Sequence, residues 1–169
     1  MKNTKVRKLV LTAIFAAIAV VGSTFSFPIM GSKCAPVQHF INVLSAVFLG
    51  PFYAIVQAFI ASLIRNLLGL GTLLAFPGSM CGAILSAVLY EKIKKLPAAY
   101  LGEIFGTGII GGLISYPVAA FIMGNKAAAL TTFVVPFLIS TVGGTVIAII
   151  VVTSMEKGEL LPKLQKSVE

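Results

Sequence analysis

The stretch GSKCAPVQHFINVLSAVFLGPFYAIVQAFIASLIRNLLGLGTLLAFPGSMCG, from Gly31 to Gly82, decides how the rest of the chain is interpreted. It contains the only histidine of the sequence, the only arginine beyond the N-terminal segment, and both cysteines. Between its polar ends lie two apolar runs, which are separated by Gly50-Pro51. The flanking sequence is mostly apolar, so we expect any specific chemistry to lie within this stretch.

The composition predicts an integral membrane protein. Of the 169 residues, 58% are hydrophobic and 11% are charged, and the mean hydropathy is +1.04. Soluble domains carry about 25% charged residues, and a soluble fold of this size could not bury so much apolar surface. The length suits one helical bundle, so residues 1–169 are expected to form a single transmembrane domain.

Apolar segments that end at Pro, Gly or charged residues predict the helices. A helix needs about 20 residues to cross the hydrocarbon core. The N-terminal segment resembles a secretory signal, but more apolar segments follow it, so we interpret it as a retained first helix. Glycines between 102 and 112 are expected to allow close helix packing, and residues 156–169 to form a solvated end. The predicted helices cover about 9–27, 37–49, 52–68, 77–90, 98–123 and 127–153.

Gly50-Pro51 is compatible with a turn between two helices or with a kink in one long helix. With a turn there are six helices, and basic clusters at 2–8, 92–95 and 157–166 all lie on one side, with 10 of the 13 Lys and Arg. With a kink, the middle cluster lies opposite the N-terminus. The positive-inside rule favours the turn, which predicts an all-α, six-helix membrane bundle with both termini cytoplasmic. The net charge of +8 therefore indicates membrane topology rather than nucleic-acid binding.

Polar residues recur on one face of each of two neighbouring predicted helices. Gln38 and Asn42 are four residues apart, and Gln57 and Arg65 are eight apart, so each pair shares a helical face. If both faces point inward, they form a polar seam near the outer surface. Polar side chains inside a membrane are costly and tend to mark functional sites. The candidate ligand-binding residues are Gln38, His39, Asn42, Arg65, Asn66, Thr72, Phe76, Ser79, Met80 and Tyr116.

Each candidate also has a simpler interpretation. Arg65 can extend to the lipid head groups, His39 can be an interfacial side chain bound to backbone, and Gln38 with Asn42 can join helices by hydrogen bonds. The aromatic candidates can be ordinary packing residues. Glu103 is expected in the inner half of the fifth helix, apart from the candidate site.

The residue inventory argues against catalysis. The sequence has one His and no Asp, so it cannot form a Ser-His-Asp triad or a catalytic Asp pair. It also lacks a P-loop, and its two cysteines are interpreted as unpaired thiols. We therefore expect no enzyme activity, no metal and no cofactor. A chain without an energy source is expected to be a binding or channel component, and any pumping must be powered by a partner or a gradient.

The segments KCAPVQHFINVLSAVFLGPFYA (Lys33 to Ala54) and RNLLGLGTLLAFPGSMCGA (Arg65 to Ala83) closely resemble the ThiW family. ThiW proteins are substrate-binding S components of energy-coupling factor (ECF) transporters. The resemblance implies a multi-pass protein of the cell membrane that binds a vitamin precursor in an outward-facing pocket. For this family the implied ligand is hydroxyethylthiazole, the thiazole moiety of thiamine.

The resemblance also implies partners. S components dock on a transmembrane coupling protein, which two cytoplasmic ATPases drive. Small residues of the first helix in an AxxxA pattern commonly form the docking surface, and Ala13 and Ala17 match that pattern here. Their spacing by itself indicates one small helical face that another helix can approach closely.

Three other functions remain possible from the residues. The chain can be an S component for another small precursor such as a pyrimidine. It can be a small membrane-embedded transferase that uses His39 and Arg65. It can also be a purely structural bundle or a passive channel, which a tightly bound stoichiometric ligand would exclude.

Overall fold

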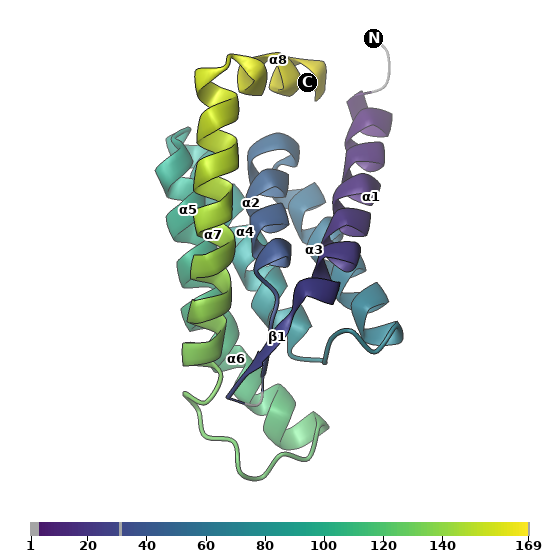
Figure 1. The fold of residues 1–169 in the computed structure, drawn as a ribbon, viewed down its shortest axis with the longest axis vertical. Helices are drawn as coiled ribbons and strands as arrows, with labels where there is room; N and C mark the ends of the chain where they lie inside the picture. The colour runs from purple at the N-terminus through teal and green to yellow at the C-terminus, as the bar shows by residue number, and fades with distance from the viewer. Residues whose placement is uncertain (1–3, 31, 169) are drawn as a thin grey trace.

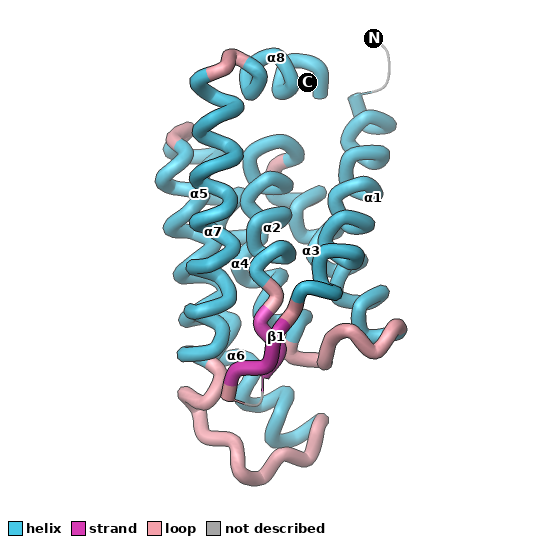
Figure 2. Tube along the Cα trace, viewed as in Figure 1, coloured by secondary structure: helices cyan, strands magenta, loops and turns pink. Residues whose placement is uncertain are grey.

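The computed structural model describes residues 4–30 and 32–168, so the basic residue Lys2 lies outside the described part. The described chain is a bundle of roughly aligned helices (Figures 1 and 2). Both of its ends lie at the same end of the bundle, which we call the terminal end (Figure 1). The opposite end carries a two-stranded antiparallel hairpin, and we call it the hairpin end.

One helix of the bundle, from 96 to 122, is continuous but contains two π-helical stretches, η2 and η3. Such stretches are uncommon in helices and are frequent at functional sites. In chain order, the elements are α1 Thr4–Gly22, η1 Ser23–Phe25, β1 Phe27–Ile29, β2 Ser32–Cys34, α2 Pro36–Leu49, α3 Pro51–Leu67, α4 Ala75–Ile93, α5 Leu96–Glu103, η2 Ile104–Gly111, α6 Gly112–Pro117, η3 Val118–Ile122, α7 Val134–Lys157 and α8 Leu160–Val168.

Helix α2 is the central element of the bundle. It packs against α1, α3, α4, α5 and α7, and ten of its residues are buried. Its 14 residues span about 21 Å, which is shorter than a hydrocarbon core of about 30 Å. The hairpin comes before α2 in the chain and lies between the start of α2 and the hairpin end of the bundle (Figure 1). The start of α2 therefore lies within the bundle rather than at its surface.

The helices have the length and composition of a membrane protein. Among the described residues, three helical segments are long and apolar enough to cross a membrane, Thr4–Phe25, Leu96–Ile122 and Val134–Lys157, with mean hydropathies of 2.0, 1.6 and 2.4. Pro36–Leu49 and Pro51–Leu67 are shorter apolar helices. The described chain is thus mainly helical, as predicted, apart from the two-stranded hairpin, and its apolar helices fit a membrane protein.

Proline and glycine mark the helix boundaries that were predicted most accurately from the sequence. The helix expected over 37–49 begins at Pro36, and the one expected over 52–68 begins at Pro51. Proline suits the first turn of a helix because no N–H is needed there. Gly50 alone joins α2 to α3, with φ of 81°, a conformation that glycine adopts readily. Gly50-Pro51 is thus a turn and not a kink.

The first helix was predicted to extend to residue 27, and this is wrong. Helix α1 ends at Gly22, and after η1 the chain forms β1, in which Phe27 pairs with Cys34 and Ile29 with Ser32. Pro28 disfavours a helical Phe27, so the segment extends as a strand. The hairpin gives α2 its buried starting point.

Two predictions about the C-terminal part also need correction. The last long helix was expected from 127, but α7 begins at Val134, since residues 124–133 form turns. The end of the chain was expected to be solvated, and most of its described residues are exposed. The sequence did not predict, however, that residues 160–168 form a helix, α8, which lies across the terminal end (Figure 1). Leu161 is buried, and the Gln165 side chain donates to the Val47 carbonyl (3.1 Å), so α8 packs on the bundle.

The glycines of the long helix serve close packing, as expected. A Cβ on Gly102 would lie 2.6 Å from Ser86 Cα, and one on Gly106 would lie 2.5 Å from the Cys81 carbonyl oxygen. These distances are shorter than any real Cβ contact, so only glycine lets α4 and the 96–122 helix approach this closely. The close approach places side chains from α4 directly beside those of α5 and η2.

Candidate functional site

A buried hydrogen-bonded cluster joins α2 to α5 in the middle of the bundle. His39 Nδ1 lies 2.8 Å from Glu103 Oε1, and Asn42 Nδ2 donates to the same oxygen at 3.1 Å. Glu103 is 0% exposed and His39 is 6% exposed. We call His39 and Glu103 the His–Glu pair. The other carboxylate oxygen, Oε2, is buried and has no hydrogen-bond partner.

Helix α4 and η2 complete the cluster. Asn42 Nδ2 also lies 3.2 Å from both the carbonyl and the hydroxyl oxygen of Ser79. Thr107 Oγ1 lies 3.0 Å from Glu103 Oε1 and 3.1 Å from the Gly78 carbonyl. The space for Glu103 and Thr107 exists because residue 82 is glycine, since a Cβ there would overlap both side chains.

A small cavity lies beside this cluster on its hairpin side. Its volume is about 30 Å³, somewhat more than the roughly 10–15 Å³ that a cavity needs to hold one water molecule. Its walls are partly polar and partly apolar. They come from β2, α2, α4, η2 and α7 and from the residue that joins β2 to α2. It is lined by Lys33, Ala35, Gln38, His39, Ala75, Gly78, Ser79, Thr107 and Phe137.

Four of the candidate residues lie at this cavity or in its wall. Gln38, His39 and Ser79 line it, and Asn42 adjoins it through Ser79. The Gln38 side chain donates to Ser62 Oγ at 3.3 Å, which ties α2 to α3. The faces of α2 and α3 that the sequence predicted to point inward are both buried.

Three candidates lie at the end of α3 and in the loop 68–74. Asn66 Nδ2 donates to the Thr72 carbonyl (2.9 Å), and the Arg65 carbonyl accepts from the Gly71 amide (3.1 Å), so both residues hold this loop against α3. The Arg65 side chain is only 2% exposed and does not extend to the surface. Its Nε is buried without a hydrogen-bond partner.

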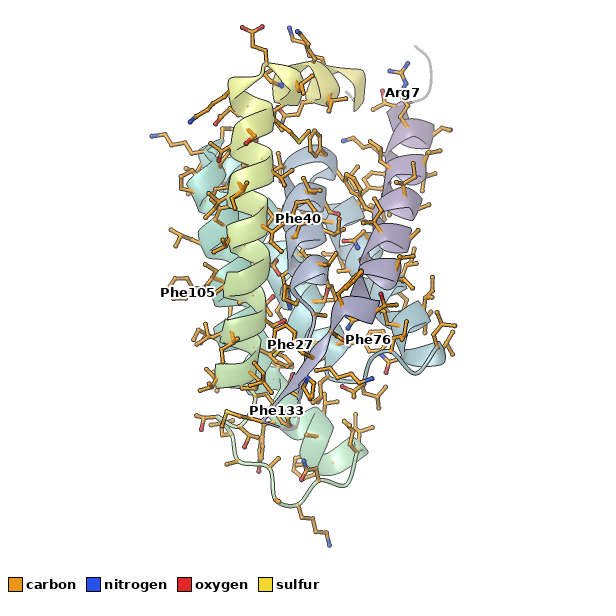
Figure 3. The ribbon with its side chains drawn as sticks, in the orientation of Figure 1. Arg7, Phe27, Phe40, Phe76, Phe105 and Phe133 are labelled. Atoms are coloured by element: carbon orange, nitrogen blue, oxygen red, sulfur yellow. The ribbon has the colours of Figure 1, made fainter. Side chains whose placement is uncertain are left out.

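The remaining three candidates are not among the residues that line the cavity. Phe76 packs against Phe59 with ring centroids 5.6 Å apart, at the hairpin end of α4 (Figure 3). Met80 packs against a cluster of buried alanines that includes Ala54 and Ala83. Tyr116 is half-buried on α6. Phe137 of α7 is the aromatic residue in the cavity wall instead.

Glu103 was expected to lie apart from the polar cluster, and this is wrong. Glu103 is the eighth residue of α5, which begins at the terminal end of the bundle. Its position along this helix was the reason for expecting it away from the site. Because α2 is short and starts inside the bundle, His39 reaches the same depth. Figure 3 shows Phe105 directed away from the bundle, whereas Glu103 and Thr107 share the opposite, buried face. The spacing of Glu103 and Thr107, four residues apart within a glycine-rich run, is the signal that could have identified them.

The two alanines predicted for docking lie on the surface of α1. Ala13 and Ala17 are both exposed. Ala17 also lines an apolar groove of about 400 Å³ together with Val21, Phe25 and Val37. The small face that the spacing predicted is therefore open to a neighbouring helix.

Among the described residues, the cysteines and acidic side chains form no metal site. Cys34 and Cys81 are free, and the Cys34 thiol donates to the Pro136 carbonyl at 3.3 Å. Burial raises the pKa of the Cys34 thiol, so the group is a poor nucleophile. Across residues 4–30 and 32–168, no three His, Cys, Asp or Glu side chains come together as metal ligands.

Comparison with known proteins places this chain in a family. The family model described as thiamine-precursor transporter protein (ThiW) matches residues 9–158, which include every element of the cluster and the cavity. No curated protein and no solved structure matches the chain. ThiW is a family of transporters and not of enzymes. Because the match covers nearly the whole sequence, the chain belongs to the ThiW family of thiamine-precursor transporter proteins.

Proposed function

We propose that the protein is the substrate-binding S component of an ECF-type importer, which captures hydroxyethylthiazole outside the cell and delivers it inward. In this proposal α1, α2, α3, α4, the 96–122 helix and α7 cross the membrane, and both termini are cytoplasmic. The basic clusters support this orientation, since they gather at the terminal end. The hairpin end then faces outward. Family membership supports the transport of a thiamine precursor.

The observation that carries the proposal is the convergence of buried polar side chains beside the cavity. Hydroxyethylthiazole is small, flat and neutral, with one ring nitrogen that accepts a hydrogen bond and one hydroxyl group. A few placed polar groups and apolar walls suffice to bind such a molecule. We assign hydrogen bonds with the ligand to Gln38, His39 and Ser79, and an apolar wall to Phe137.

Ligand access requires movement, because the cavity is much smaller than a thiazole ring system. On the outer side of the cavity lies Lys33 of the hairpin, and its Nζ joins the hairpin to the loop 68–74 by donating to the Gly69 carbonyl at 3.1 Å. Gly69 has φ of 72°, a conformation with little cost for glycine. In the proposal, Arg65, Asn66 and Thr72 act through this loop, with Arg65 also available as a direct donor.

The first prediction concerns ligand binding. Purified protein titrated with hydroxyethylthiazole by calorimetry is expected to bind one molecule per chain. Gln38→Ala and Arg65→Ala are each expected to weaken binding by about tenfold or more, because each removes a buried hydrogen-bonding group. Lys126→Ala is the matched control, since Lys126 is an exposed cation at the same end of the bundle. Unchanged affinity in both Gln38→Ala and Arg65→Ala would show that the ligand does not bind at this site.

Competition binding and turnover measurements distinguish this function from the other candidate functions. A pyrimidine precursor that displaces hydroxyethylthiazole and binds more tightly would assign the protein to another substrate. A transferase would turn over a candidate substrate without ATPase partners and lose that activity in His39→Ala. Tight binding without turnover supports the S component.

The second prediction concerns partner docking. In Ala17→Leu the larger side chain is expected to keep a partner helix from approaching α1, so the variant should not co-purify with the coupling protein and its two ATPases. Its affinity for hydroxyethylthiazole should remain that of the wild type, because Ala17 lies outside the cavity. Val146→Phe on the exposed face of α7 adds comparable bulk elsewhere and should co-purify normally. Normal co-purification of Ala17→Leu would argue against docking at this face.

A further inference from the structure

The charge on the His–Glu pair determines what the cavity offers a ligand. Glu103 makes its only ion-pair contact among the described residues with His39. A net charge buried at this depth is costly, and the described residues offer Glu103 no second ion-pair partner. The pair is therefore most stable when its net charge is zero.

Two proton arrangements give a neutral pair, and both place a hydrogen on His39 Nε2. In the first, imidazolium donates from Nδ1 to the carboxylate and also carries a proton on Nε2. In the second, a protonated Glu103 donates to Nδ1, so the single imidazole proton is on Nε2. Only the anionic pair, with neutral His39 donating from Nδ1, leaves Nε2 as an acceptor. Because Glu103 occupies Nδ1, Nε2 is the ring nitrogen left to bind a ligand.

We propose that the His–Glu pair presents an N–H donor from His39 Nε2 to the cavity, so that the site selects a neutral heterocycle with an unsubstituted ring nitrogen. A heterocycle whose ring nitrogen is alkylated is cationic and has no lone pair to accept this hydrogen bond. The site would thus take a free thiazole and reject a thiazolium. This inference rests on the proposed function, and it names Glu103 as the residue that positions His39.

The surroundings of the pair support this selection. Lys33 lines the same cavity, so a cationic ligand would meet the positive charge of this side chain. Glu103 is not among the residues that line the cavity, and its unpartnered Oε2 lies against Gly82, where a Cβ would be 2.6 Å away. A cationic ligand in the cavity therefore faces His39 and Lys33 rather than the carboxylate.

Direct measurement is possible because the sequence contains a single histidine. Full-length protein with a histidine-free affinity tag and a histidine-selective ¹⁵N label would give nitrogen resonances from His39 alone. We expect a protonated Nε2 in the free protein and a shift of that resonance when hydroxyethylthiazole is added. An unprotonated Nε2 in the free protein would overturn the proposal, and this readout does not depend on which ligand binds.

Ligand selectivity gives the second measurement. Hydroxyethylthiazole and its N-methyl thiazolium derivative are compared by calorimetry on the same preparation. The neutral thiazole is expected to bind at least about tenfold more tightly, as expected for one hydrogen bond to a charged group. Equal affinity, or tighter binding of the thiazolium, would overturn the inference. If neither compound binds, the proposed function fails, whereas the ¹⁵N result still decides the state of the pair.

Discussion

His39→Leu is expected to lower the free energy of unfolding by about 3–5 kcal/mol, because it leaves Glu103 buried without its ionic partner. Leucine has a similar volume, so lost packing contributes little. For a chain of this length, the loss corresponds to a fall in Tm of roughly 6–20 °C. Thermal unfolding in detergent, followed by the loss of monodisperse protein on size exclusion, measures it.

The matched variant replaces both members of the pair. His39→Leu combined with Glu103→Leu is expected to recover most of the lost stability, because replacing a buried ion pair by apolar side chains is often neutral or stabilising. Asn42 would still donate to Ser79, and Thr107 to the Gly78 carbonyl, so neither polar group is left alone. A double variant less stable than His39→Leu would contradict the assignment of the lost stability to the unpaired charge of Glu103.

Gly106→Ala is expected to destabilise the bundle by about 1–3 kcal/mol or more, as overpacking does. The added Cβ would lie 2.5 Å from the Cys81 carbonyl oxygen and 2.8 Å from Gly82 Cα. Both are backbone atoms, so α4 and η2 have to separate, and Glu103 moves with them. The same unfolding assay detects the loss, and ligand affinity is expected to fall with it.

Gly143→Ala is the control for this change. Gly143 also lies within a long helix, α7, but a Cβ there meets only Pro36 side-chain atoms at 3.6 Å, an ordinary contact. Alanine favours a helix interior over glycine by up to about 1 kcal/mol, so this variant is expected to be as stable as the wild type or more stable. Equal losses from both substitutions would show that close packing at Gly106 is not the cause.

The sequence located the features that depend on local chemistry. Pro36 and Pro51 begin helices, and Gly50 has the backbone conformation that a tight turn needs, so the boundaries near them were predicted within one residue. The inward faces of α2 and α3 followed from the spacing of their polar residues. These features depend on neighbours within a few positions along the chain.

Features that depend on the depth of a residue in the bundle, or on contacts between distant parts of the chain, were not predictable from local sequence. Nothing near Glu103 in the sequence indicates that α2 starts inside the bundle, and this placement is what brings His39 to its level. The hairpin depends on pairing between Phe27 and Cys34 across a turn. Helix α8 depends on a surface for Leu161 and Gln165, which only the assembled bundle provides.

The cavity wall was only partly predictable for the same reason. Gln38, His39 and Ser79 stand in polar segments that the sequence singles out. Thr107 and Phe137 stand in apolar helices and resemble ordinary packing residues until the bundle is assembled. Phe76 and Met80 are close to Ser79 in the sequence but do not line the cavity, because successive positions on a helix point to different sides.

The return of the chain to the terminal end has a practical consequence for orienting the molecule in a cell. A polypeptide whose two ends lie on the same side of a bilayer crosses the bilayer an even number of times. In the proposed topology, a reporter fused to the N-terminus and another fused to the C-terminus would therefore lie in the same compartment. Protease protection of either fusion alone would then show on which side of the membrane the hairpin end lies.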